Sequence, residues 1–529
     1  MLPVESYSGA TERLICHDPT ATRFGRLTRP PVPCIVQRTG HNRIARNDEV
    51  NVDHKIPVPY ARAPRSWRTL RGDLDRASER HDAELSAGLP ADSPWRDRMI
   101  GADVLLFGCR LIDGSGAAPV DHAYVLIRNG RIVDVGTGEP RISNIELYDL
   151  SSYTVMPGLI DGHVHLLSSA TTDRSNARSF DAFTFVEEKT LHAASNAAAA
   201  LAAGFTTVRD MAGSRAEVAV KHASADGVIE AARVVSAGFV GMTGGHGDMF
   251  LPPAVEKRLW ETADGPVACR TLVRRYAREG HDLVKICTSG GVLSSGDRLE
   301  WRNYNDEEIA AVTDEAHALG MRVAAHAHTK GGVMQAALGG VDTIEHGSML
   351  DEECVQLLLD RDVALCPTLT LQEYLASGDA DPPLSPAAQE KAQVVHQRHA
   401  ESLRLAHGAE VRIFAGTDSC NAMPFGRHAH ELALLVELAG MSSMQALLAA
   451  TSAAARALAV DADTGSLVPG KWADLLIVDG DPSENVKILE QPGKLYTIMK
   501  AGRPTLGTAA NLARLRSNAT TRVAEPTSQ

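Results

Sequence analysis

The stretch TVMPGLIDGHVH, residues 154–165, is the first of eight short apolar runs that decide the fold. Each run has the length of a strand, and polar residues gather at the ends of several of them. The runs occupy 154–165, 205–210, 233–242, 282–290, 322–328, 342–347, 363–369 and 411–419. Ala-rich helical stretches lie between runs, for example SNAAAALAAG at 195–204. Strands that alternate with helices predict a parallel α/β fold, and eight of them predict a TIM-like (β/α)8 barrel over 155–463.

An open, doubly wound sheet is the alternative architecture for the same alternation of strands and helices. No GxGxxG motif opens a helix after the first run, which weakens that alternative. The polar residues fall at the carboxyl ends of the runs, where barrel enzymes place their chemistry. The pattern therefore favours the barrel and predicts a site at its carboxyl-terminal rim.

The two segments that flank the predicted barrel share a different sequence pattern, rich in residues typical of β-strands. The runs within 103–154 are parted by Gly, Asn and Asp, with Asn129-Gly130 as a hairpin turn signal, and similar sequence returns at 464–508. We expect these two segments to form one composite, discontinuous β-sandwich domain. Residues 1–98, rich in Arg, Pro and polar residues, predict a poorly ordered extension, and 509–529 predict a flexible tail.

Composition indicates an ordinary globular enzyme, with 44% hydrophobic and 22% charged residues. A net charge of -13 argues against nucleic acid as a partner. No apolar stretch is long enough to span a membrane, and the first residues lack the apolar core of a secretory signal. The eight cysteines form no CxxC pair. We therefore expect a cytoplasmic address and no membrane partner. A homo-oligomer is a separate expectation, which these features do not test.

Histidines at the ends of three runs predict a metal site. His163 and His165 alternate along one strand, so both imidazoles point to the same side. His326 and His346 end two later runs and would reach the same rim. Taken singly, each is more commonly a hydrogen-bonded histidine, but four at equivalent strand ends favour a metal such as zinc.

Two further residues complete the predicted set. An ammonium on Lys285 would be repelled by nearby cations and would lose its hydration, whereas a neutral amine can add CO2 to form an anionic carbamate that bridges two metals. The alternative is a lysine that extends to the rim and pairs with an acid. Asp418 can bind a metal and accept a proton, or alternatively cap a helix.

The order HxH, Lys, His, His and Asp on strand ends resembles the amidohydrolase superfamily in its two-metal, carbamylated-lysine form, over about 103–505. The segments FTTVRDMAG, SAGFVGMTGGHGDMF, VKICTSGGVLSSGD and AAHAHTKGG resemble the imidazolonepropionase-related Xaa-Pro dipeptidase group and ochratoxinase-like carboxypeptidases within it. This resemblance implies hydrolysis of an amide bond to an amino acid by a metal-bound hydroxide. The substrate would be a dipeptide-like or other small molecule, including N-acyl amino acids and ochratoxin-like amides.

The resemblance also implies roles for the individual residues. His163, His165 and Asp418 would hold one divalent ion and His326 and His346 the other, with carbamylated Lys285 as the bridge. Zn²⁺ is the expected metal, because neutral imidazole suits it. Asp418 would act as proton shuttle, and His328 would bind the substrate carbonyl or developing oxyanion. Further candidates for substrate binding are His246, Arg209 and Lys330; Arg209 could equally form an internal ion pair with Asp210.

Two other functions remain open at this stage. An imidazolonepropionase-like hydrolase of cyclic amides, or a mononuclear deaminase, would use the same scaffold, but such relatives do without a bridging lysine. A non-catalytic scaffold homologue would have lost metal ligands, and every expected ligand is present here. The number of bound metal ions would separate the three functions.

Overall fold

The computed structural model describes residues 103–138, 145–171, 180, 183–250, 260–294, 296–378, 380 and 383–516. The extension predicted for 1–98 lies outside the described residues, and so does the predicted tail beyond 516. In the described part of the chain, no helix combines the length and apolar character that crossing a bilayer requires.

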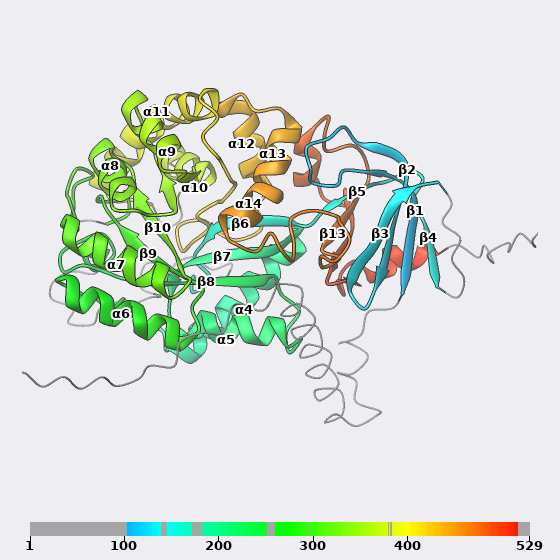
Figure 1. Ribbon diagram of the computed structural model, residues 1–529, viewed down its shortest axis with the longest axis horizontal. Helices are drawn as coiled ribbons and strands as arrows, with labels where there is room; N and C mark the ends of the chain where they lie inside the picture. The colour runs from blue at the N-terminus through cyan, green and yellow to red at the C-terminus, as the bar shows by residue number, and fades with distance from the viewer. Residues whose placement is uncertain are drawn as a thin grey trace, which may run out of the picture. The chain divides into compact units, whose positions relative to one another are not determined.

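Seven parallel strands form the central sheet, and each pairs with the strand that follows it in the chain. They are β6 (Leu159–Val164), β7 (Phe205–Gly213), β8 (Arg233–Phe239), β9 (Leu283–Cys287), β10 (Arg322–Ala327), β11 (Thr343–His346) and β12 (Ala364–Cys366). Most of their residues are buried, as expected when helices cover a parallel sheet. The strictly sequential order makes this sheet a nearly closed barrel (Figure 1).

The eighth predicted strand, 411–419, occupies the gap between β12 and β6 without forming a regular strand. The Phe414 N–H donates to the Leu365 carbonyl at 3.0 Å, and the Gly162 N–H donates to the Ala415 carbonyl at 2.8 Å. A Cβ on Gly416 would lie 2.4 Å from the Cys366 sulfur, so only glycine fits there. The prediction of eight strands is corrected to seven strands and one irregular segment, which fills the gap through separate backbone hydrogen bonds to β12 and β6.

Helices follow the strands and cover the outside of the sheet (Figure 1). They are α4 (Val186–Ala202), α5 (Arg215–Ala225), α6 (Pro266–Glu279), α7 (Asp306–Ala318), α8 (Lys330–Leu338), α9 (Glu352–Asp360), α10 (Leu369–Ser377), α11 (Pro386–Gly408), α12 (His430–Ala439), α13 (Ser443–Ala449) and α14 (Ser452–Ala457). Two short 3-10 helices are η1 (Asp248–Phe250) and η2 (Val486–Glu490). α7 begins at a capping box of Asn305 and Glu308, which satisfies backbone N–H groups at its first turn.

A second sheet joins the two flanks of the barrel. Its strands are β1 (Val104–Leu111), β2 (Val120–Arg128), β3 (Arg131–Thr137), β4 (Glu146–Asp149), β5 (Thr154–Pro157), β13 (Leu475–Val478), β14 (Leu495–Lys500) and β15 (Arg503–Pro504). β5 pairs antiparallel with β13 and leads directly into β6. The described strands belong to one sheet, so a sandwich of two facing sheets stays a prediction.

Two local features of these flanks bear on the sequence predictions. Asn129 and Gly130 have φ of 49° and 77°, which is the left-handed pair that a type I′ hairpin turn requires. The hairpin between β2 and β3 is thus present. Within the predicted flexible tail, α15 (Ala509–Arg514) is helical, and it buries Leu512.

Candidate active site

One cavity of about 340 Å³ opens at the carboxyl ends of the barrel strands. Its lining includes all six residues predicted as metal ligands, namely His163, His165, Lys285, His326, His346 and Asp418. His163 lies in β6 and His165 directly after it, while Lys285, His326 and His346 belong to β9, β10 and β11. Asp418 comes from the irregular segment 411–419. Residues up to 255 positions apart in the sequence, from 163 to 418, therefore meet at one rim.

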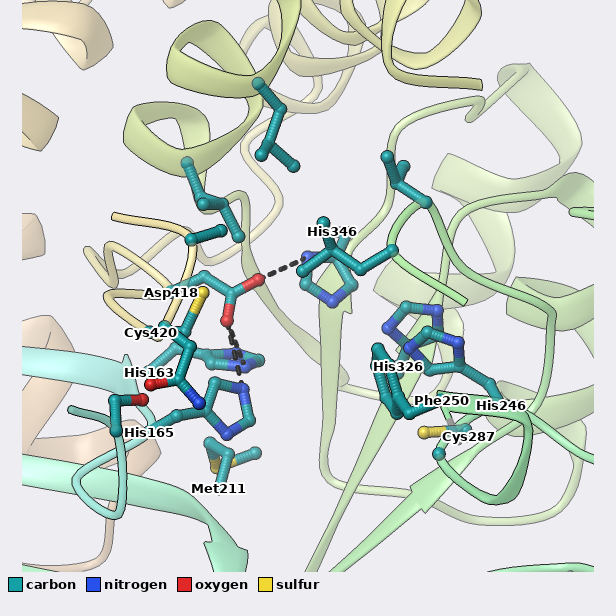
Figure 2. Close-up of a pocket in the computed structure, with 18 of the residues that line it drawn as sticks. His163, His165, Met211, His246, Phe250, Cys287, His326, His346, Asp418 and Cys420 are labelled. Carbon is teal, nitrogen blue, oxygen red and sulfur yellow. Dashed lines mark ion pairs between the residues drawn. The ribbon is translucent and has the colours of Figure 1, made fainter. Parts of the chain in front are cut away.

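The Asp418 carboxylate lies among three of the histidines, as Figure 2 shows. Its Oδ1 is 3.0 Å from Nε2 of His165 and 3.5 Å from Nε2 of His163, and its Oδ2 is 4.0 Å from Nδ1 of His346. The carboxylate is positioned by backbone as well as by side-chain contacts, because the Asp418 N–H donates to the His163 carbonyl at 2.7 Å.

His326, His328 and His246 pack against His346 and against one another through their rings. The ring centroids of His326 and His346 are 4.5 Å apart, and His328 lies parallel to His346 at 4.6 Å. His246 stacks on His326 at 4.3 Å. We call His163, His165, His326, His328 and His346, together with Lys285 and Asp418, the imidazole cluster.

Buried hydrogen bonds orient the rings of the imidazole cluster. Nδ1 of His163 lies 2.8 Å from Oε2 of Glu345, and Arg209 donates to both oxygens of the same carboxylate at 2.7 and 2.8 Å. Nδ1 of His346 lies 2.7 Å from the Thr368 hydroxyl. When a partner holds one ring nitrogen, the other is left to face the cavity, as in metal-binding histidines.

Three residues in or beside the imidazole cluster have unusual backbone conformations. His346, Thr368 and Asp418 have φ of 76°, 55° and 58°, a left-handed conformation that non-glycine residues seldom adopt. Such conformations persist where the surrounding structure imposes them, and they are concentrated at functional sites.

Burial lowers the pKa of four histidines of the imidazole cluster below the usual value. Burial, with the nearby Lys285 ammonium, lowers the pKa of His163 to about 4. Burial and neighbouring histidines lower the pKa of His328 to about 3 and hold those of His326 and His346 well below the usual value. Burial by itself would raise the pKa of Asp418, but His163 and His165 lower it below its usual value. Neutral imidazoles and an ionised carboxylate are the forms that bind metal ions.

The spacing of the ligand atoms also suits metal ions. His326, His328 and His346 form one group whose ligand atoms all lie within 4.8 Å of one another, and His163, His346 and Asp418 form a second. A third group of this spacing includes Glu345 and Cys366, but the Glu345 carboxylate is already paired with Arg209. His165 lies outside these groups and contacts Asp418 instead. The donor set therefore fits divalent cations, with His328 available as a ligand in addition to the predicted residues.

Lys285 is buried in β9 and lines the cavity beside this donor set. Among the described residues, its Nζ has no hydrogen-bond or ion-pair partner within bonding distance. In the part of the chain that the structure describes, Lys285 therefore does not form the ion pair with an acid that was the alternative prediction. A lysine in this position can form a carbamate only as the neutral amine.

The residues predicted to bind substrate separate into two groups. His246 and His328 line the cavity. Nδ1 of His246 lies 2.9 Å from the Ser294 hydroxyl and 3.3 Å from Asp297, whose other oxygen accepts from Lys391 at 3.1 Å.

Arg209 and Lys330 do not line the cavity. Arg209 is fully buried beneath it, and its ion-pair partner is Glu345 rather than Asp210. Lys330 is half-exposed and binds Asp351 and Glu353, each at 2.6 Å. The substrate-binding prediction is corrected for both residues, because each cation already forms ion pairs with acidic side chains of the protein.

Apolar side chains form the rest of the cavity. We call Phe239, Phe250 and Trp260 the aromatic wall; Trp260 packs edge to face against both phenylalanines. We call Val292, Leu293, Leu371, Leu375 and Leu384 the aliphatic wall. The cavity therefore has apolar walls next to the imidazole cluster.

The amidohydrolase family matches residues 154–505, well over half of the chain. The chain belongs to the amidohydrolase family. Ochratoxinase from Aspergillus niger is 30% identical over 421 residues, which cover 75% of this amidohydrolase and 86% of the relative. The solved structure of a Xaa-Pro dipeptidase with bound methionine is similar at 30% identity and a TM-score of 0.69, over 76% of this chain and 100% of that one.

The crystal structure of the A. niger ochratoxinase is also similar, at 29% identity and a TM-score of 0.69, over 77% of this chain and 96% of that one. These relatives confirm the predicted resemblance to the ochratoxinase and dipeptidase group. The amidohydrolase is thus a hydrolase that acts on amide bonds.

Several residues that shape the site escaped the sequence reasoning. Glu345 precedes His346 in DTIEHG, and an acid within a buried strand was a signal that it has a charged partner. Thr368 and Asp297 follow strand ends, but nothing in their neighbourhood predicted which histidine each would contact. Asp161, a further buried acid of β6, accepts the His163 N–H at 3.0 Å and pairs with the His428 ring.

Proposed function

We propose that this amidohydrolase is a binuclear, metal-dependent enzyme that cleaves the amide bond to an amino acid. Dipeptides, N-acyl amino acids and ochratoxin-like amides are the substrate classes. The observation that carries the proposal is the meeting of neutral imidazoles, an unpaired buried lysine and an ionised aspartate in one cavity with apolar walls.

His163, His165 and Asp418 would hold one divalent ion and His326 and His346 the other, with a carbamate on Lys285 shared between the two. Zinc is the metal we expect, because imidazole and carboxylate are its common ligands. Two such ions, when bound, polarise the amide carbonyl and make water a stronger nucleophile at neutral pH.

Asp418 would move the proton. Its carboxylate is ionised at neutral pH, since its pKa lies below the usual value, so it can accept a proton from the attacking water. Its Oδ1 faces His165 at 3.0 Å, which leaves Oδ2 as the freer oxygen. The same oxygen can return the proton to the leaving amide nitrogen, so that one carboxylate serves both halves of the reaction.

His328 and His246 would orient the substrate. Nδ1 of His328 lies 3.0 Å from the Ser348 hydroxyl, so Nε2 is the nitrogen left to bind the substrate carbonyl. In His246, Ser294 and Asp297 occupy Nδ1, and Nε2 is likewise left for a polar group of the substrate. The aromatic and aliphatic walls would hold the apolar groups that flank the amide.

The test is a turnover assay of purified, zinc-loaded protein on Xaa-Pro and Xaa-Arg dipeptides and N-acyl aromatic amino acids, with metal content measured in parallel. We expect about two ions per chain, as in two-metal hydrolases. The Asp418→Asn variant should lose turnover by about 10²–10⁴-fold, the usual contribution of a general acid-base group, while it still binds metal.

Each alternative function predicts a different result. About one ion per chain together with deamination would favour the mononuclear deaminase, and absence of metal would favour the scaffold homologue. Unchanged turnover of Asp418→Asn would contradict the assignment of Asp418 as proton shuttle.

A further inference from the structure

A polar side chain, Gln372, lies among the leucines that α10 contributes to the aliphatic wall. α10 follows β12 and presents Leu371, Gln372 and Leu375 to the cavity. The leucines belong to an apolar cluster with Val292 and Cys420, and Figure 2 shows Cys420 next to Asp418. The wall therefore begins beside the reacting groups and continues along α10.

Gln372 is 2% exposed, and its carbonyl oxygen is buried with no hydrogen-bond partner among the described residues. A buried polar atom of this kind costs stability, and native proteins seldom contain one without a role. The terminal torsion of a glutamine is broad, so its amide can turn and present either the oxygen or the nitrogen to the cavity. A packing role alone would be filled at lower cost by leucine or methionine.

We propose that Gln372 determines substrate specificity by binding a hydroxyl on the apolar group that fills the aliphatic wall. A hydroxyl both donates and accepts, so it can pair with either end of the amide. The preferred substrates are then amides whose apolar part is a phenol or a similar hydroxylated group, not a plain hydrocarbon. This inference rests on the proposed function, because it names the substrate class of the same cavity.

The size of the expected preference follows from the cost of an unpaired amide. A site built to hydrogen-bond a substrate hydroxyl strongly rejects the analogue that lacks it, whereas a purely apolar pocket distinguishes such a pair only weakly. A bound hydrocarbon would leave the Gln372 carbonyl oxygen without a partner, whereas a substrate hydroxyl could donate to it. We expect a preference of about tenfold or more in kcat/KM for the hydroxylated substrate.

The experiment compares two matched substrate pairs with the zinc-loaded full-length protein. One pair, N-benzoyl-tyrosine and N-benzoyl-phenylalanine, varies the amine side; the other, para-hydroxybenzoyl-phenylalanine and benzoyl-phenylalanine, varies the acyl side. The variant is Gln372→Met, which keeps the side-chain length but removes the hydrogen bond. The matched control is Leu375→Met, one turn further along α10, which should change both members of a pair alike.

Binding of the product acids, tyrosine against phenylalanine and para-hydroxybenzoate against benzoate, is measured by calorimetry as a readout that needs no turnover. We expect at least one pair to favour the hydroxylated member in the wild type, and Gln372→Met to abolish or invert that ratio. Equal ratios in wild type and Gln372→Met would overturn the inference while the amidase function stands. Absence of turnover on every substrate would overturn the proposed function, and the binding ratios would then still decide the role of Gln372.

Discussion

The imidazole cluster and the aliphatic wall line the same cavity but are held in different ways. Specific hydrogen bonds orient imidazole rings of the cluster. The His163 ring bonds to Glu345, and the His346 ring bonds to Thr368. Leu371 and Leu375 are held by apolar packing. The free energy of such packing is roughly proportional to the buried area and does not depend on direction. Substitutions in the imidazole cluster should therefore cause a large loss of activity or stability. Substitutions in the aliphatic wall should cause smaller, graded losses.

The largest effect is expected for Lys285→Met, which removes the amine from the imidazole cluster and keeps an apolar side chain of similar length. We expect the metal content to fall and activity to drop on the order of a thousandfold, comparable to the loss of a main charge-stabilising group. Nuclear magnetic resonance with isotopically labelled carbon dioxide should detect a carbamate in the wild type alone. A variant that retained full metal content and activity would break the proposed role of Lys285.

Glu345→Ala tests whether the cluster depends on its buried ion pair. The substitution leaves the Arg209 guanidinium buried without its partner, so the free energy of unfolding should fall by about 3–5 kcal/mol. Chemical denaturation measures this change. The matched control is Glu353→Ala, which removes an exposed partner of Lys330 and should cost less than about 1 kcal/mol. Similar losses in both variants would contradict the role of Glu345.

Leu375→Ala tests the graded behaviour of the aliphatic wall. Because Leu375 is fully buried, we expect a loss of about 2 kcal/mol in unfolding free energy, at the low end for leucine since one side already faces a cavity. The kcat/KM for aromatic substrates should fall about tenfold, mainly through KM, with a smaller change for N-acetyl-glycine. Leu338→Ala on the half-exposed face of α8 serves as control. A complete loss of activity would show that the wall is as specific as the cluster.

The smallest expected effect on stability concerns His430, which contacts the α10 helix that carries part of the aliphatic wall. His430 lies between Glu373 of α10 at 2.8 Å and Glu490 at 3.0 Å; burial opposes its charge, but the two carboxylates prevail and raise its pKa. A raised folded-state pKa means that the stabilisation is full below the unfolded value and is lost as pH rises through the folded one.

His430→Gln should therefore lower the melting temperature at about pH 6 more than at about pH 9, on either side of the ordinary histidine pKa. The difference should correspond to less than about 1 kcal/mol, because the pair is partly exposed. Equal shifts at both pH values would show that the ring acts by packing alone.

The sequence by itself determined the alternation of strands and helices and the identity of the residues at the strand ends. His163, His165, Lys285, His326, His346 and Asp418 could be found because period-2 geometry and strand order place them at one rim whatever the loops do. The turn at Asn129-Gly130 was predictable for a similar reason, since its chemistry is local.

Only the tertiary structure decided the partners of these residues. Arg209 looked like a substrate contact until the fold brought Glu345 to it from another strand, and Lys330 until α9 supplied its acids. The sequence of segment 411–419 predicts a strand, yet in the fold the segment is irregular, with Gly416 packed closely against β6 and β12. Side-chain pairing depends on contacts between residues that are distant in the chain, and no local pattern encodes which of several polar groups will meet.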